Sequence, residues 1–279
     1  MSFNFLSVPF LVTVIAAAQF NHDNSAENGQ YAGRAASYNN ATTDSPDLPT
    51  AVEVRIKLKS YLDQGLRLPN GMTCVCPSGF QCSYLGTVEP RCFMAFSVMV
   101  SPPRGSIQYM TTEFLPLTDS GALDLSRVTN EQANQWSQPH VFHLNGKPAA
   151  ISVFVHHMGV EINAQTGALA QMQSVVHVDT FVQDLQQVLP TTASKNDDHS
   201  VTLTGQVIQT QLSLSYSVKC AGDALGMNCD LQCNQSSVQS DIALCRSIDT
   251  GFLYTCSYTD NNLQVRFHNC CQHFRRILR

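Results

Sequence analysis

Strict alternation of apolar and polar residues marks the first ordered element of this chain. In AVEVRIKLKSYL, beginning at Ala51, apolar side chains at even positions alternate with mostly charged ones. This period of two predicts a strand with one face buried on a sheet. A second alternating strand leads into Cys220 and contributes Leu212, Leu214, Tyr216 and Val218. Before Ala51, residues 19–50 are polar and show no periodicity, which predicts a flexible lead segment.

Other elements follow from shorter patterns. LRLPNGM predicts a turn in which Pro69-Asn70-Gly71 supplies the positive φ angle, and CFMAFSVMV from Cys92 predicts an apolar strand. Residues 101–138 read as loop-rich, with one strand in SIQYMTTEF. Two apolar runs around Asn145-Gly146 predict a hairpin. TFVQDLQQVL, from Thr180 to Leu189, has helical spacing and is followed by Pro190, which predicts a helix.

The first 20 residues decide the compartment. MSFNFLSVPFLVTVIAAAQF is an apolar run that ends in small residues, as in a secretory signal peptide cleaved near Ala17 or Ala18. A membrane anchor is the alternative, but the run is short for crossing a bilayer. We therefore expect a secreted chain, membrane-anchored only if the sequence continues beyond its present C-terminus. Asn40 and Asn234 head acceptor sequons for N-glycosylation in that compartment.

The C-terminal quarter is rich in cysteine. Of the 11 cysteines, seven fall between Cys220 and Cys271, among few large apolar residues. So small a segment cannot bury much core, and each disulfide closing a short loop would add about 2–4 kcal/mol of stability. Zinc at Cys229-x3-Cys233 is the rival interpretation, which an oxidising compartment disfavours. The remaining cysteines near the first strand, in CVCPSGFQC and its neighbour, leave three pairings open among Cys74, Cys76, Cys82 and Cys92.

No pattern predicts catalysis. The net charge of −5 argues against a nucleic-acid partner, and H-E-x-x-H, G-x-S-x-G and Walker motifs are absent from the sequence. His140-x-x-His143 and His156-His157 lie on expected strands, where residues one or three apart point to opposite faces, so neither pair converges on a metal. The acids are scattered, and sequence alone does not bring together Asp119, Asp124, Asp179 and Asp184. We predict a binding protein with no metal or cofactor.

The cysteine spacing resembles a known family. C-x8-C-x3-C-x11-C from Cys220 to Cys245, the strand leading into Cys220, and Gly226 three residues before Cys229 resemble the start of the DSL module of Notch ligands, the Delta/Serrate family. The resemblance implies the disulfides Cys220–Cys229 and Cys233–Cys245, and Cys256 with Cys270 or Cys271. Residues 52–100 resemble the family's N-terminal module.

The resemblance implies a mainly β fold: a C2-like antiparallel β-sandwich followed by a small disulfide-rich DSL module, which is related to EGF-like folds. The expected segments are a signal peptide at 1–18, a lead segment at 19–50, the sandwich at 51–189, a connector at 190–200, a lead-in strand at 201–217, the DSL module at 218–271 and a tail at 272–279. Some family members bind calcium or phospholipid through the end loops of the sandwich, and the sequence itself does not support a calcium site.

The implied function is binding to EGF-like repeats of a Notch receptor, as a co-ligand or modulator acting with a membrane-bound ligand. Family members place aromatics in two loops of the module, but this chain has Leu225 before Gly226 and has Gln239 and Ser240 in the second loop. The residues left to contact a receptor are Leu225, Gly226, Met227, Val238, Gln239, Ser240 and Ile242. Because aromatic side chains dominate interface energetics, the alternative is a secreted structural or matrix protein that has lost receptor binding.

Overall fold

The structure is a computed structural model that describes residues 50–86, 92–191, 198–222, 224–239, 242–260 and 265–273. Of residues 234–239, 242–243, 257–260 and 265–273 it describes the backbone alone. The expected signal peptide, the lead segment as far as residue 49, the sequon at Asn40 and the tail from residue 274 lie outside the described residues.

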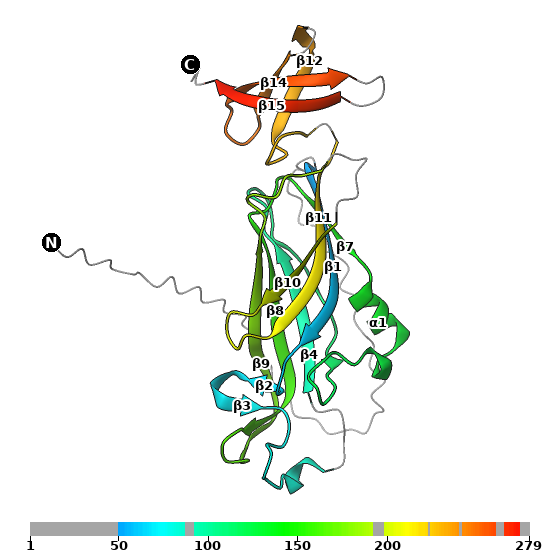
Figure 1. The fold of residues 1–279 in the computed structure, drawn as a ribbon, viewed down its shortest axis with the longest axis vertical. Coiled ribbons are helices and arrows are strands. Elements are labelled where there is room, and N and C mark those ends of the chain that lie inside the picture. The colour runs from blue at the N-terminus through cyan, green and yellow to red at the C-terminus, as the bar shows by residue number, and fades with distance from the viewer. Residues whose placement is uncertain are drawn as a thin grey trace, which may run out of the picture. The chain divides into compact units, whose positions relative to one another are not determined.

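The described chain is mainly β, with two sheets around one core and a third, cysteine-rich sheet formed by the last strands (Figure 1). The first sheet has the order β10-β11-β1-β7 and is built from β1 (Val52–Leu62), β7 (His140–Leu144), β10 (His199–Thr204) and β11 (Gln211–Cys220). The second has the path β2-β3-β8-β4-β5, with β6 paired to β4 and β9 to β8. Its strands are β2 (Arg67–Leu68), β3 (Met72–Thr73), β4 (Cys92–Val100), β5 (Gln108–Thr111), β6 (Leu115–Pro116), β8 (Ala150–Asn163) and β9 (Leu169–Asp184). The expected antiparallel β-sandwich with a disulfide-rich module is thus observed.

The alternation predicted at the start of the sandwich is confirmed. Every second side chain of β1 from Val52 to Leu58 is buried, and the intervening ones are at least partly exposed. β11 pairs with β1 antiparallel from Val52↔Cys220 to Leu62↔Gln211, with one register shift between Leu58 and Ser60. Leu212, Leu214 and Val218 of β11 are buried as well. The single lead-in strand expected over residues 201–217 is therefore wrong: that stretch covers parts of two strands of the sandwich, β10 and the central strand β11.

The turn at Pro69 is also confirmed. Asn70 has φ 60° and Gly71 has φ 70°, within a short 3-10 turn, η1 (Pro69–Gly71), that joins β2 to β3. Asparagine and glycine tolerate this left-handed conformation better than other residues do.

The predicted hairpin at Asn145-Gly146 is wrong. β7 pairs with β1 in the first sheet, whereas β8 pairs with β4 and β9 in the second. Gly146 has no positive φ, which a two-residue hairpin turn of that type would require. A Cβ at Gly146 would instead lie 2.7 Å from Cγ of Pro103, so this glycine permits close packing where the chain crosses between the sheets.

The predicted helix from Thr180 to Leu189 is wrong too. Residues 180–184 complete β9, where Phe181 pairs with Val153 of β8 and is fully buried. Pairing with a long neighbouring strand outweighs the helical spacing of a short segment. One real helix, α1 (Asn130–Ser137), lies in the segment expected to be loops. Its capping box, in which Thr129 and Gln132 bond reciprocally, is readable in the sequence.

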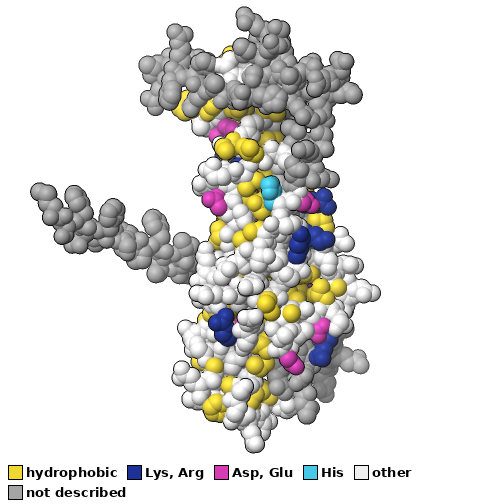
Figure 2. All heavy atoms as spheres, in the orientation of Figure 1, with side chains coloured by type: hydrophobic (Ala, Val, Ile, Leu, Met, Phe, Trp, Pro, Cys, Tyr) yellow, Lys and Arg dark blue, Asp and Glu magenta, His cyan; other side chains and the backbone are white. Residues whose placement is uncertain are grey.

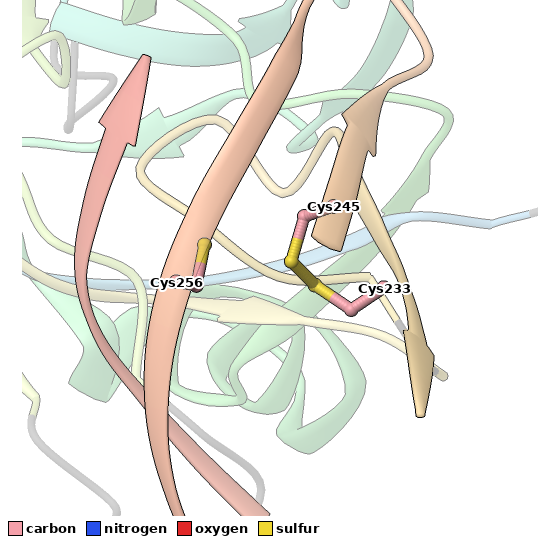
Figure 3. A group of neighbouring side chains, drawn as sticks. All are labelled: Cys233, Cys245 and Cys256. Carbon is pink, nitrogen blue, oxygen red and sulfur yellow. A yellow bond between two sulfur atoms is a disulfide. The ribbon is translucent and has the colours of Figure 1, made fainter. Parts of the chain in front are cut away.

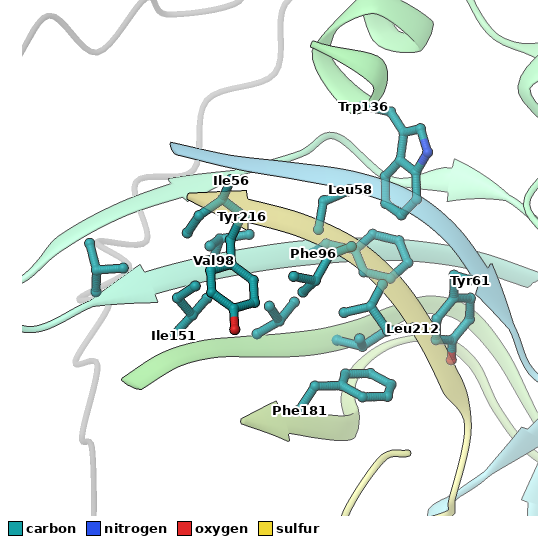
Figure 4. Packing of buried hydrophobic residues seen from close by; sticks show 14 of the residues in the cluster. Ile56, Leu58, Tyr61, Phe96, Val98, Trp136, Ile151, Phe181, Leu212 and Tyr216 are labelled. Atoms are coloured by element: carbon teal, nitrogen blue, oxygen red, sulfur yellow. The ribbon is translucent and has the colours of Figure 1, made fainter. Parts of the chain in front are cut away.

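A cluster of aromatic side chains lies in the core of the sandwich (Figure 4). Phe96 of β4 packs edge-on against Tyr61 at 5.0 Å and against Trp136 of α1 at 4.8 Å between ring centroids. Phe181 lies edge-on to Tyr61 at 6.4 Å.

Two further 3-10 turns lie in the connections. The turn η3 (Leu125–Arg127) precedes α1, and the turn η2 (Ser83–Leu85) follows Cys82.

The third sheet has the order β12-β13-β14-β15, formed by β12 (Leu231–Gln239), β13 (Ile242–Ser247), β14 (Leu253–Asp260) and β15 (Val265–His273). Its described core is small: Leu231, Cys245 and Cys256 are buried, with Leu225, Cys233 and Tyr254 packed against them. So small a core agrees with the expectation that disulfides replace packing here.

Surface charge is sparse. On the face drawn in Figure 2, Lys and Arg side chains form small separate groups with apolar side chains between them. In the described part of the chain, no helix has both the length and the apolar content needed to cross a bilayer.

Candidate functional site

Disulfides define the framework of the C-terminal module. Cys220 is bonded to Cys229, and Cys233 to Cys245, which are the two pairs that the cysteine spacing implies by resemblance. Cys256 is disulfide-bonded as well. Its expected partners, Cys270 and Cys271, lie on β15, which pairs with β14 through Thr255↔Cys271. Their side chains are outside the described residues.

Three of these sulfur atoms lie together in the core of the module (Figure 3). The Sγ atoms of Cys233, Cys245 and Cys256 are within 4.8 Å of one another. A metal would need them as thiolates, but each is oxidised in a disulfide. Cys229 and Cys233, the spacing that suggested zinc, belong to different disulfides. The cluster is therefore a covalent core rather than a metal centre.

The first loop of the module is closed at its base by backbone pairing. Leu225 and Leu231 exchange both hydrogen bonds, at 3.1 Å and 3.0 Å, so the loop between them is tight. Gly226 has φ +87°, and a Cβ there would lie 2.8 Å from Cδ1 of Leu231. Both the conformation and the space require glycine at this position. Leu225 itself packs into the small core of the module.

Met227 is the exposed apolar residue of this loop. Its side chain is 45% exposed, and the turn beneath it is held by the Cys229 N–H, which donates to the carbonyl of Gly226 at 3.2 Å. Cys229 is fully buried and has φ 53°, so the disulfide holds a residue other than glycine in a left-handed conformation. Met227 is thus exposed on a loop that the Cys220–Cys229 disulfide closes.

The second loop joins β12 to β13. Its ends meet at the pair Gln239↔Ile242, while Ser240 lies outside the described residues. The side chains of Val238, Gln239 and Ile242, and that of the sequon residue Asn234, are likewise not described. The structure therefore places Val238 and Gln239 at the end of β12 and Ile242 at the start of β13.

The outer face of β13 is exposed. Leu244 is 46% exposed, and Arg246, two residues on, is exposed on the same face, opposite to the buried Cys245. Behind it, the hydroxyl of the buried Ser247 donates to the carboxylate of Asp230, and the Ile248 N–H donates to the Asp230 carbonyl at 2.7 Å. These bonds fix the end of β13. The sequence did not single out Leu244 or Arg246, because their exposure depends on which face Cys245 occupies.

Near the start of the sandwich, the structure resolves the pairing that the sequence left open. Cys74 is bonded to Cys92, and Cys76 to Cys82. Cys74 and Cys92 are buried, so their disulfide joins the first turn of the sandwich to β4 within the core.

Two buried acids lie beneath the loops at one end of the sandwich. The carboxylate of Asp179 accepts hydrogen bonds from the N–H groups of Thr180, Val207 and Thr210 and from the Thr210 hydroxyl, at 2.8–3.0 Å. Asp63 is fully buried, and Nε of Arg67 is 3.9 Å from its Oδ1. Burial raises the pKa of Asp63 to about 6, with the neighbouring Arg67 opposing the rise.

Three of the four acids that are scattered in the sequence lie in separate local contacts. Asp179 is occupied as described, Asp124 accepts from the Ser126 N–H and pairs with Arg127, and Asp184 accepts from the Gln186 N–H. Within the described residues, acidic side chains do not form a group of three with converging oxygens. Calcium prefers six to eight oxygen ligands, so these residues do not fit it.

His156 and His157 lie on opposite faces of β8. His157 is fully buried, with its ring nitrogens 3.2 Å from the Phe93 carbonyl and 3.3 Å from the Val160 carbonyl. Burial lowers its pKa, against the effect of those two carbonyls. His140 contacts the Gln135 carbonyl at 2.9 Å. Neither His140 with His143 nor His156 with His157 forms a converging pair. His156 instead lies opposite His177 of β9.

Comparisons with known proteins give a weak likeness in structure. No family model matches the chain, and a search of curated proteins finds no match. Among solved structures, the chain is similar to a Drosophila C2-DSL-EGF1 fragment, with 17% sequence identity and a TM-score of 0.38, over 66% of this chain and 74% of that one.

Proposed function

We propose that this chain is an extracellular protein of the Notch-ligand type, which binds EGF-like repeats of a Notch receptor through its C-terminal module and performs no chemistry. The observation that carries the proposal is the cysteine framework. The three intervals of C-x8-C-x3-C-x11-C match those of the DSL module, and the two disulfides they imply by resemblance are the two that form.

The first loop supports a binding role. Its base is closed by the Leu225–Leu231 pair, and its glycine is required by both conformation and space. A loop held in one shape loses little conformational entropy on binding, which favours affinity. Met227 stands exposed on that loop, and methionine adapts well to irregular partner surfaces.

The two apolar residues of the first loop have different roles in this proposal. Leu225 belongs to the core of the module, so its truncation acts on folding. Met227, together with Leu244 and Arg246 on β13, is accessible to a partner. Contact and packing are therefore separable by mutation.

A structural extracellular protein is the second candidate. Between Cys220 and Cys229 the loop holds no aromatic residue, and aromatics are the side chains most enriched among interface hot spots. That candidate predicts an intact, disulfide-bonded module without affinity for receptor repeats.

The deciding experiment is binding of the purified secreted chain to immobilised ligand-binding repeats of a Notch receptor from the same organism. We expect saturable binding, at least about fivefold weaker for Met227→Ala or Leu244→Ala, since truncating one hot spot costs about 1–2 kcal/mol. Tyr109→Ala is the matched control, because Tyr109 is a 70% exposed residue of the sandwich.

Two outcomes would overturn the proposal. One is absence of binding at high micromolar concentration by a chain whose module disulfides are verified by mass spectrometry. The other is binding that Tyr109→Ala weakens as much as the module variants do. Leu225→Ala should lower the stability of the module in hydrogen exchange, which identifies its effect as one on folding.

A further inference from the structure

A histidine pair forms across two strands of the second sheet. His156 of β8 is directly opposite His177 of β9 in the antiparallel register. Directly opposed residues project from the same face of a sheet, with Cβ atoms about 4.5–5.5 Å apart. The two rings accordingly meet edge-on, with centroids 5.3 Å apart and an interplanar angle of 61°.

The pair lies on the outer face of the sheet, where His156 is half-buried and His177 is exposed. His157, the next residue, points to the opposite face and is fully buried. On the other side of His156, Ala95 of β4 is its direct partner and is only 4% exposed. Phe154 lies 6.2 Å from the His177 ring. Ala95 therefore lies beside His156, and the ring of Phe154 lies beside that of His177.

The hydrogen bonding leaves one nitrogen of His177 available. Its Nε2 is 3.0 Å from the hydroxyl oxygen of Thr180. When Nε2–H donates to that oxygen, Nδ1 carries the lone pair and can bind a metal. A hydrogen bond of this kind from the far nitrogen is the usual way in which proteins orient a metal-binding histidine.

We propose that His156 and His177 form a two-histidine binding site for a divalent transition metal of the zinc type on the outer face of the sandwich. Imidazole suits zinc, copper and nickel, whereas magnesium and calcium prefer oxygen. Structural zinc sites usually have four protein ligands. With two protein ligands, this site would leave coordination positions open for water or for a side chain of a partner.

Other histidines whose side chains the structure describes do not offer such a pair. His140 contacts a backbone carbonyl, and His199 stacks on Tyr216 at 5.2 Å. His143 is exposed on β7 in the other sheet. It is therefore a matched control: an exposed strand histidine without a histidine opposite it, since its partner on β1 is Glu53.

The test is calorimetric titration of the full secreted chain with Zn²⁺ at neutral pH, after alkylation of any free thiol and without a histidine tag. We expect one equivalent to bind, with a loss of affinity of more than about tenfold for His156→Ala and for His177→Ala. His143→Ala should bind as the unmodified chain does, within about twofold, and Mg²⁺ should not bind. Thr180→Val should weaken binding by about tenfold, because it removes the orienting hydrogen bond.

The inference is overturned if Zn²⁺ fails to bind, or if His156→Ala and His177→Ala bind it as tightly as the unmodified chain. A loss in His143→Ala equal to theirs would overturn it as well. Near-UV circular dichroism of each metal-free variant checks that the sandwich is intact. Imidazole NMR signals provide a second readout, in which Zn²⁺ should shift those of His156 and His177 and leave that of His143 in place.

Discussion

The carboxylate of Asp179 lies where a side chain at position 205 would be: a Cβ on Gly205 would be 1.9 Å from Oδ2 of Asp179. Gly205 lies between β10 and β11, in the loop whose N–H groups Asp179 binds. A strand from one sheet thereby fixes the loop that connects two strands of the other. The requirement for glycine at position 205 is steric. It does not come from the backbone conformation, because the φ angle of Gly205 is not in the left-handed region.

Gly205→Ala should therefore destabilise the sandwich by about 2–3 kcal/mol, because the new methyl group displaces a buried, hydrogen-bonded carboxylate. Urea unfolding followed by tryptophan fluorescence measures this, since Trp136 is buried in the core. Gln206→Ala, at the exposed neighbouring position, should change stability by less than about 0.5 kcal/mol. Equal losses in the two variants would contradict the steric argument.

Asp179→Ala should cost more than about 3 kcal/mol, because it leaves three N–H groups and one hydroxyl without their acceptor. Asp184→Ala on the same strand is the control, since Asp184 is exposed and accepts from one N–H. Combining Asp179→Ala with Gly205→Ala should give a total loss smaller than the sum of the single losses. Additive losses would show that the two residues act independently.

The stability of the sandwich should fall as pH rises through the pKa of Asp63. That pKa is raised by burial to about 6, above the value of the unfolded chain, so folding favours the protonated form. Its contribution is fully present below the unfolded pKa and is lost through about pH 6, on the order of 2 kcal/mol. Asp63→Asn should abolish this component between about pH 4 and pH 8 and should stabilise the chain at neutral pH. Asp198→Asn, which removes one carboxyl group at an exposed position, is the control.

Replacing Cys233 and Cys245, which belong to the core of the module, together by serine should destabilise the module by about 2–4 kcal/mol while the sandwich stays folded. The reason is that the module has a small core, whereas the sandwich has its own large one. Hydrogen exchange resolved by residue distinguishes the two regions. Loss of protection in β4 and β8 as great as that in β13 and β14 would contradict this separation.

The sequence predicts those elements whose signals are local and lie on one strand. The alternation of apolar and polar residues in β1 and β11 indicates which face of each strand is buried. The residue types of Asn70-Gly71 indicate a backbone with positive φ. The pairing of Cys220 with Cys229 and of Cys233 with Cys245 is implied only by the resemblance to the DSL module, since spacing alone does not determine which sulfurs meet.

Features that depend on register are not readable in this way. His177 is 21 positions from His156, and only the pairing of β8 with β9 brings the rings together. The burial of Phe181 opposite Val153 follows from the same pairing, and it explains why helical spacing misled the prediction for residues 180–189. The crossing at Asn145-Gly146 depends on which sheet each flanking strand joins, which a hairpin signal does not encode.

The continuity of β11 has a mechanical consequence. This strand ends at Cys220, the first cysteine of the module, and is bonded to β1 along its length on one side and to β10 from Gln211 to Tyr216 on the other. Antiparallel hydrogen bonds run perpendicular to the strands, so a pull along β11 loads both ladders in shear and all their bonds resist together. Tension applied to the module would therefore pass into the sandwich through a central strand that is hydrogen-bonded on both sides.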